Sequence, residues 1–311
     1  MQILNDVTVR DPIVINVSFF CPLEDDETLP DINDAPTQSK AAMRGACALT
    51  AIANYRKKVC SGQLPVDVFG HKKKSLCSTG FKYHLHSCRI PMKHQDSFRI
   101  YDPFLHKHCV VACRGQFFAM DLVDEKDNPL HFHAIEKGLE RCAKLAKEKP
   151  MLQFGFLTTS ERDAWAKNRE LLVQVGGENM VKALETIESS VALICLDETN
   201  PSTLNECAPI YWHGGYGPTM NRWFDKPVQI LCQSNGRAAY FAEHSMIDGM
   251  LTDRLCDDIV HSKYAILSGR QAETTDVPFI ENIFENTIDL VLASEEISDA
   301  IEKGEILRAN I

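Results

Sequence analysis

The chain has 311 residues, a net charge of −10 and 44% hydrophobic residues, which is enough for about two domains with apolar cores. The acidic balance argues against nonspecific nucleic-acid binding, which depends on lysine and arginine neutralising phosphates. No apolar run approaches the roughly 18 residues of a membrane span, and the first ten residues resemble neither a secretory signal nor a transit peptide.

The chain contains twelve cysteines, and they are spread along its whole length without a Cys-x-x-Cys pair. Disulfide frameworks are typical of short secreted domains, and several of these cysteines lie among apolar neighbours. We therefore expect reduced thiols in an intracellular compartment. The sequence does not distinguish the cytoplasm from a mitochondrion or a peroxisome.

The first hundred residues contain two predicted elements and two polar segments. An apolar run at 13–20 predicts a strand, and an acidic, proline-containing loop follows at 23–36. Small and apolar residues at helical spacing predict a long helix over 39–59. The basic run at 71–74 (HKKK) fits either a solvated loop or a site for an anionic ligand.

The middle of the chain mixes strands and helices. The pattern predicts two strands within 109–123 that turn at Arg114 and Gly115, and then a helix over 135–146 that Pro150 ends. A buried strand is predicted at 154–157. A helix follows from an N-cap at Ser160, supported by Asp163, through Leu172, and a strand is predicted at 191–196.

A hairpin follows, because strands at 228–232 and 237–243 flank Asn235 and Gly236, residues that favour a tight turn. Helices are predicted at 253–265 and 288–301. These elements indicate an α/β fold in which helices flank a mixed sheet, without a strict βαβ rhythm. One domain fits the pattern as well as two.

His244 is the first candidate for chemistry. With a period of two residues, Tyr240, Ala242 and His244 share one face of the strand, so the imidazole leaves the hairpin where the chain turns. Asp248 is near enough to fix the tautomer of this histidine or to brace the turn, and such a histidine is a suitable general base. A structural histidine beside a turn aspartate remains the alternative.

Other chemistries have weaker support. Three His-x-His pairs, 84/86, 106/108 and 131/133, can each chelate zinc from one face of a strand, and Cys109 and Cys113 lie beside the second pair. No further ligand spacing completes a metal site, and no serine elbow or phosphate-binding glycine motif is present. The glycines at 214–217 favour a tight turn.

Several blocks resemble the choline/carnitine O-acyltransferases, in the same order and at similar spacing. These blocks are 10–12 (RDP), 87–91 (SCRIP) with Asp96, 115–118 (GQFF), 157–160 (LTTS) with Arg162, Trp165, Ala166 and Arg169, 211–217 (YWHGGYG), 221–226 (NRWFDK) and 243–249 (EHSMIDG). Within the family, 17–20 (VSFF) and the last block are most similar to fungal-type carnitine O-acetyltransferases.

The resemblance implies a CoA-dependent acyltransferase domain of the chloramphenicol acetyltransferase type. It implies transfer of an acetyl group between coenzyme A and the hydroxyl of carnitine, with acetyl-CoA as co-substrate and no permanently bound cofactor or metal. His244 matches the catalytic histidine of the family, and Asp248 matches the carboxylate that supports it. We expect a monomer without nucleic-acid partners.

The resemblance also implies an incomplete site. The family's Ser-Thr-Ser-type motif, carnitine-carboxylate site and most CoA-binding lysines belong to a C-terminal half without a counterpart here. We therefore expect residues 1–311 to be essentially one domain, the half that carries the histidine, with little or no turnover in isolation. The alternatives are a catalytically inactive remnant or interaction partner of this family, and a zinc-binding protein.

Overall fold

The computed structural model describes residues 7–30, 39–148, 153–215, 217, 220–270 and 277–309. Its largest sheet has, within these residues, seven strands in the order β1-β10-β9-β8-β6-β7-β11. The pairs β9–β8 and β8–β6 are parallel and the other neighbours are antiparallel, so the sheet is mixed, as predicted.

The strands of this sheet are β1 (Ser18–Pro22), β6 (His108–Cys113), β7 (Gln116–Asp121), β8 (Leu193–Asp197), β9 (Gln229–Gln233), β10 (Ala238–Glu243) and β11 (Ile280–Asn282). Two small sheets are formed by β2 (Val68–Phe69) with β3 (Lys74–Ser75) and by β4 (Ser87–Ile90) with β5 (Ser97–Ile100). The helices are α2 (Ile13–Asn16), α3 (Lys40–Cys60), α4 (Phe81–His84), α5 (Phe132–Lys147), the 3₁₀ helix η2 (Phe154–Thr159), α6 (Arg162–Ser189), α7 (Leu204–His213), α8 (Gly249–His261), α9 (Tyr264–Ser268), α10 (Ile288–Leu292) and α11 (Glu295–Ala309).

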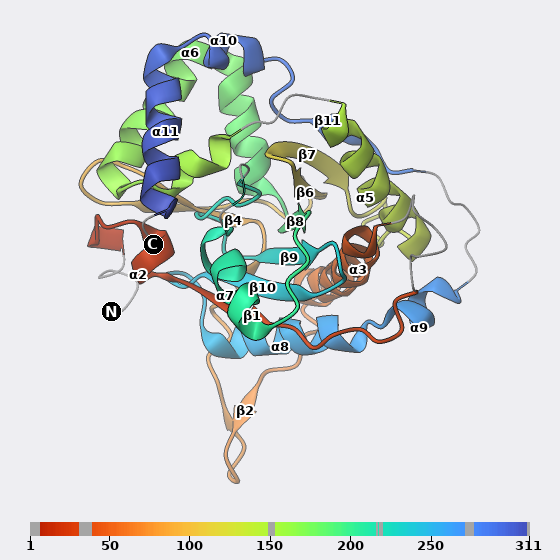
Figure 1. Ribbon diagram of the computed structural model, residues 1–311. Coiled ribbons are helices and arrows are strands. Elements are labelled where there is room, and N and C mark those ends of the chain that lie inside the picture. The colour runs from red at the N-terminus through yellow and green to blue at the C-terminus, as the bar shows by residue number, and fades with distance from the viewer. Residues whose placement is uncertain are drawn as a thin grey trace.

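Helices cover both faces of the sheet (Figure 1). On one face, α3, α5, α8 and α9 pack in a core with alternate strand residues such as Tyr240 and Ala242. On the other face, η2, α6, α7 and α11 pack with the intervening residues, such as Ala239 and Phe241. The period-two prediction for this strand is therefore confirmed, and the fold is α/β with a mixed sheet flanked by helices.

Several predicted elements are confirmed by the structure. The long helix over 39–59 is α3, and the strands at 109–123 are β6 and β7, which turn at Arg114 and Gly115 with positive φ values of 52° and 73°. The hairpin is β9–β10, and Gly236 at its turn has φ 89°. Pro150 and residues 31–36 of the acidic loop lie outside the described residues.

One predicted strand begins later than expected, and another is wrong. Residues 13–16 form the helical turn α2, in which Ile13 and Val14 are buried, and the strand begins only at Ser18. The run at 154–157 belongs to η2, where the Thr158 and Thr159 hydroxyls bond carbonyls three residues back at 2.7 Å. Both runs are apolar because they are buried, and burial alone does not separate a strand from a helical turn.

The boundaries of three predicted helices also differ. The N-cap of α6 is Glu161 rather than Ser160, and this helix continues to Ser189, interrupted at Gly177 by non-helical angles (φ 60°, ψ −147°). The helix predicted at 253–265 is α8 followed by α9, and the one at 288–301 is α10 followed by α11.

All twelve cysteines are free thiols, and eight of them are buried. Burial among apolar side chains agrees with their predicted role as small core residues. Among the helices that the structure describes, none is both long and apolar enough to cross a bilayer.

Candidate active site

His244 lies directly after β10, where the chain leaves the sheet. Its backbone N–H donates to the carbonyl of Val17 at 3.3 Å, and its ring packs edge-on against Phe19 of β1 with centroids 5.0 Å apart. The pairing of β1 with β10 thus fixes both the backbone and the ring of this half-buried histidine. None of the side-chain hydrogen bonds found in the described residues uses its ring nitrogens.

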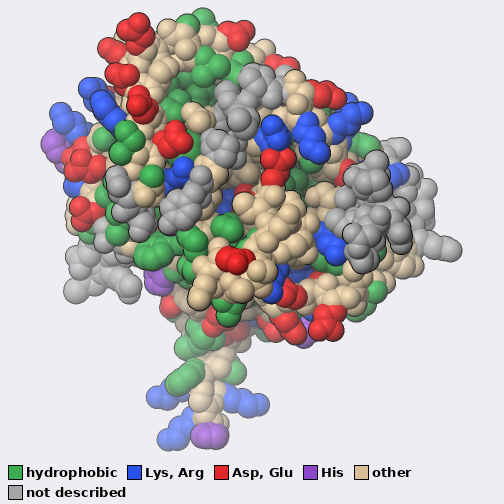
Figure 2. All heavy atoms as spheres, viewed as in Figure 1, with side chains coloured by type: hydrophobic (Ala, Val, Ile, Leu, Met, Phe, Trp, Pro, Cys, Tyr) green, Lys and Arg blue, Asp and Glu red, His purple; other side chains and the backbone are tan. Residues whose placement is uncertain are grey.

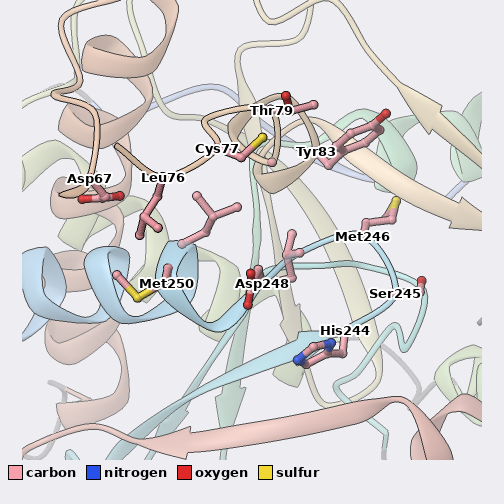
Figure 3. Close-up of a pocket in the computed structure, with 13 residues that line it drawn as sticks. Asp67, Leu76, Cys77, Thr79, Tyr83, His244, Ser245, Met246, Asp248 and Met250 are labelled. Atoms are coloured by element: carbon pink, nitrogen blue, oxygen red, sulfur yellow. The ribbon is translucent and has the colours of Figure 1, made fainter. Parts of the chain in front are cut away.

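The imidazole faces a pocket of about 470 Å³ (Figure 3). One wall is the turn from His244 into α8, and the opposite wall is the segment between β3 and α4. The lining residues are Asp67, Leu76, Cys77, Thr79, Gly80, Tyr83, His244, Ser245, Met246, Ile247, Asp248, Met250 and Leu251. A mostly apolar pocket with few polar groups around a histidine is typical of a small-molecule site.

Asp248 lines the same pocket, but its carboxylate caps α8. The Oδ1 atom accepts a hydrogen bond from the backbone N–H of Gly249 at 2.6 Å, and the side chain is exposed. Within the described residues, no hydrogen bond joins Asp248 to His244. Of the two roles considered from the sequence, bracing the turn is the one that this geometry shows.

Both sequence neighbours of His244 are held in a buried ionic network. The Glu243 carboxylate accepts from Arg89 Nη1 at 2.9 Å and from the Ser245 hydroxyl. Arg89 lies on β4 and is fully buried, as is Glu243. The histidine therefore lies between two side chains that both hydrogen-bond to Arg89 of β4.

The network continues away from the site through Asp96. Its Oδ2 atom accepts from Arg89 Nε at 2.7 Å and from Arg162 Nε at 2.6 Å, and Oδ1 pairs with Arg10 at 3.0 Å. Burial tends to raise the pKa of Asp96, but the two buried guanidinium groups outweigh it, so that the pKa is lowered. Arg162 also pairs with Asp225 at 2.7 Å.

The block at 221–226 has a structural role. Asn221 accepts from the backbone N–H of Gly115, and Arg222 pairs with Asp197 at 2.7 Å. Asp225 accepts from the Trp165 indole at 2.6 Å, and Lys226 donates to three backbone carbonyls at 2.9–3.0 Å. Burial raises the pKa of Asp225 and lowers that of Lys226 to about 8.

Sequence reasoning named the blocks that meet in this network but assigned no role to their charged residues. Arg10, Arg162 and the pair of Arg89 and Asp96 come from three separate segments of the chain and meet in one ionic network. The available signal was a charged residue inside an apolar segment, such as Glu243 at the end of AAYFAE, because a charge on a buried face needs a partner.

The first His-x-His pair does not form a common ligand face. The ring of His84 lies between the hydroxyls of Tyr55 and Tyr240, at 3.1 and 3.2 Å, whereas His86 bonds Arg56 and the carbonyl of Ser189. Burial lowers the pKa of both histidines to about 3. His86 has φ 54°, so the segment is not the strand that the zinc hypothesis requires.

The other two pairs are also engaged locally. His108 bonds the carbonyl of Thr186 at 2.7 Å, and burial lowers its pKa to about 4. His131 caps α5 by accepting from the backbone of His133, whose own ring contacts Glu136. In the part of the chain that the structure describes, no three His, Cys, Asp or Glu side chains are arranged to hold a metal ion.

The glycine segment after α7 is a tight turn, as predicted. Gly214 and Gly215 have φ values of 84° and 71°, and Arg308 of α11 donates to the carbonyls of Gly215 and Gly217 at 2.7 and 2.8 Å. Tyr216, within the same block, lies outside the described residues.

Comparison of the sequence with protein-family models finds a match that includes all of these sequence blocks. The family model described as "Choline/Carnitine o-acyltransferase" matches residues 6–305, which is nearly the whole chain. The chain belongs to the choline/carnitine O-acyltransferase family. The matched range contains all of the blocks on which the resemblance rested.

Three relatives with different names have the same sequence identity to this chain. The mitochondrial carnitine O-acetyltransferase of Saccharomyces cerevisiae is 29% identical over 78% of this chain and 36% of its own length. The choline O-acetyltransferase of Gallus gallus is 29% identical over 72% of this chain and 36% of its own. The highly reducing polyketide synthase ltbA of Aspergillus luteorubrus is 29% identical over 71% of this chain and 7% of its own.

The chain therefore spans about a third of the length of the carnitine and choline acetyltransferases that it matches. A solved chloramphenicol acetyltransferase aligns over 84% of this chain and 93% of its own, with 12% identity and a TM-score of 0.37.

Proposed function

We propose that this chain is the histidine-bearing part of an acyltransferase that moves an acetyl group between coenzyme A and the hydroxyl of carnitine. The observation that carries the proposal is the position of His244, at a pocket of about 470 Å³ and between two side chains anchored in a buried ionic network. Family membership supports acyl transfer as the class of reaction.

In the proposed mechanism His244 is the general base. It removes the proton from the hydroxyl as that oxygen attacks the thioester carbon, and the tetrahedral intermediate collapses with cleavage of the carbon–sulfur bond. The proton on the imidazole then passes to the CoA thiolate. No acyl-enzyme forms, because both substrates are held together at the histidine. We propose that Asp248 supports His244 from the start of α8, and that the rest of the site lies in a C-terminal half.

The test is release of CoA thiol from acetyl-CoA by the purified chain, with and without carnitine. We expect slow, carnitine-dependent release, because the chain provides only part of the site. His244→Gln is expected to abolish it, and His261→Gln is the matched control because His261 is an exposed histidine at the end of α8, away from the pocket lining. Equal rates in the two variants would reject His244 as the base.

A second candidate is a family member without catalytic activity that acts as an interaction partner. It is favoured by one observation, the engagement of Asp248 with the cap of α8 rather than with His244. This candidate is supported if carnitine-dependent release stays absent even from a longer chain that carries the C-terminal half. The same assay tests the acceptor when choline replaces carnitine, and it tests the acyl length when longer acyl-CoA thioesters replace acetyl-CoA.

A further inference from the structure

The basic run at 71–74 forms the tip of a hairpin that projects from the body of the molecule (Figure 1). Phe69 of β2 pairs with Lys74 of β3, and the turn closes through a hydrogen bond from the N–H of Lys73 to the carbonyl of Gly70 at 3.0 Å. His71 and the three lysines are all exposed. Figure 2 shows these cationic side chains at the end of the hairpin, away from the acidic side chains of the body.

The charge of this tip is not compensated locally. Among the described residues, no carboxylate lies within ion-pair distance of Lys72, Lys73 or Lys74, whereas Arg254 at the base of the hairpin is paired with Asp67 at 2.8 Å. Three unpaired lysines on a chain of net charge −10 form a local site of attraction for anions.

The base of the hairpin is part of the wall of the candidate site. Asp67, Leu76 and Cys77 line the pocket together with His244. Arg254 of α8 donates to the Asp67 carboxylate and also to the carbonyl of Pro65 at 2.7 Å, so the hairpin base is attached to the helix that follows the histidine. The hairpin therefore extends outward from one wall of the pocket (Figure 1).

The hairpin also presents an aromatic ring beside its lysines. Phe69 is 69% exposed, and Val66 and Val68 are each 52% exposed. Aromatic rings stack on nucleobases, and lysines form ion pairs with phosphate oxygens. The combination of an exposed phenyl ring and three unpaired lysines therefore suits a phosphorylated nucleotide better than a simple inorganic anion.

We infer that this hairpin binds the nucleotide end of coenzyme A, with Lys72, Lys73 and Lys74 on the phosphates and Phe69 against the adenine. The inference rests on the proposed function, because it places the thioester end of the same molecule in the His244 pocket. It assigns a contribution to coenzyme A binding to this chain, in addition to any made by a C-terminal half.

The experiment compares two triple variants by calorimetric titration with CoA and with pantetheine, which lacks the phosphates and the adenine. One variant is K72Q/K73Q/K74Q, and its matched control is K137Q/K144Q/K147Q, which removes the same charge from exposed positions of α5. We expect the hairpin variant to bind CoA about tenfold more weakly at low salt, with pantetheine binding unchanged. Phe69→Leu is expected to weaken the binding of CoA but not of pantetheine.

Three results would overturn the inference: CoA affinity unchanged in the hairpin variant, an equal loss in the α5 variant, or no CoA binding by the parent chain. The proposed function is tested separately, by measuring thiol release from an acetyl-pantetheine thioester in the presence of carnitine. Release from acetyl-pantetheine that depends on His244, together with a CoA affinity that the hairpin variant leaves unchanged, would keep the function and reject the nucleotide site.

Discussion

Arg89 is a fully buried residue that joins two carboxylates, Asp96 and Glu243. Its removal leaves both without a full set of partners, and an uncompensated buried charge is expensive. We expect Arg89→Met to lower the free energy of unfolding by about 3 kcal/mol or more, measured by urea denaturation.

The control for this substitution is Arg99→Met on the adjacent strand β5. Arg99 lies opposite Cys88 in the β4–β5 pair, and its side chain is 58% exposed. We expect a change of less than about 1 kcal/mol, because Arg99 is largely in solvent and its partner Glu188 retains an ion pair with Arg169. Similar losses in the two variants would contradict the role assigned to the buried network.

His84 makes the stability of the fold sensitive to acid. Its pKa is lowered from 6.5 to about 3 by burial, so the unfolded chain takes up a proton below about pH 6.5 and the folded chain does not. Stability is therefore lost as pH falls from about 6.5 toward 3, by about 1.4 kcal/mol per pH unit for each such histidine.

We expect His84→Gln to reduce this slope, because glutamine retains hydrogen-bonding capacity toward Tyr55 and Tyr240 and does not titrate. The measurement is urea denaturation at several pH values between about 7 and 5. His261→Gln, at an exposed position, is expected to leave the slope unchanged. A parent chain with a flat profile over this range would contradict the assignment.

Asp248 has two proposed roles, because it is the N-cap of α8 and the residue that we propose supports His244. Asp248→Ala removes the N-cap and is expected to destabilise the chain by about 1 kcal/mol in urea denaturation. Asp248→Asn retains a capping side chain and removes the charge, so we expect near-parental stability with slower carnitine-dependent thiol release. Parental activity in the asparagine variant would limit Asp248 to the capping role.

Elements with a regular pattern could be predicted from the sequence, whereas two short buried runs were assigned wrongly. The helix α3 and the hairpin β9–β10 have clear periodicity and turn residues. The runs at 13–16 and 154–157 are too short to show a period, and their conformation is set by tertiary packing. In η2, for example, a Cβ on Gly155 would lie 2.5 Å from the carbonyl oxygen of Met220.

Part of the candidate site could be predicted from the sequence, and part could not. His244 and Asp248 lie in one short block, so local pattern and family resemblance were sufficient to propose them. The ionic network that flanks the histidine joins residues that are far apart in the chain, such as Arg89 and Glu243, which are 154 positions apart. No local pattern predicts which buried charge pairs with which, because the pairing depends on the completed sheet.

At the scale of the whole molecule, the reactivity of the twelve thiols distinguishes the folded chain from the unfolded one. Only Cys77 is exposed, and hydrogen bonds from Thr79 lower its pKa, whereas burial raises the pKa of core thiols such as Cys47 and Cys195 to about 12. We expect Ellman's reagent to label one thiol quickly in the native chain and all twelve after denaturation. The fast phase should disappear in Cys77→Ser; a fast phase that persists there would contradict this assignment.

The pairing of β1 with β10 has a consequence for biosynthesis. Ser18 lies opposite Glu243, so the first strand to leave the ribosome waits for nearly all the other strands before its partner exists. Until then the nascent chain carries an unpaired strand edge, and Arg89 lacks Glu243 while Arg162 lacks Asp225. The strand β1 can therefore join the sheet only late in translation, after β10 has been synthesised.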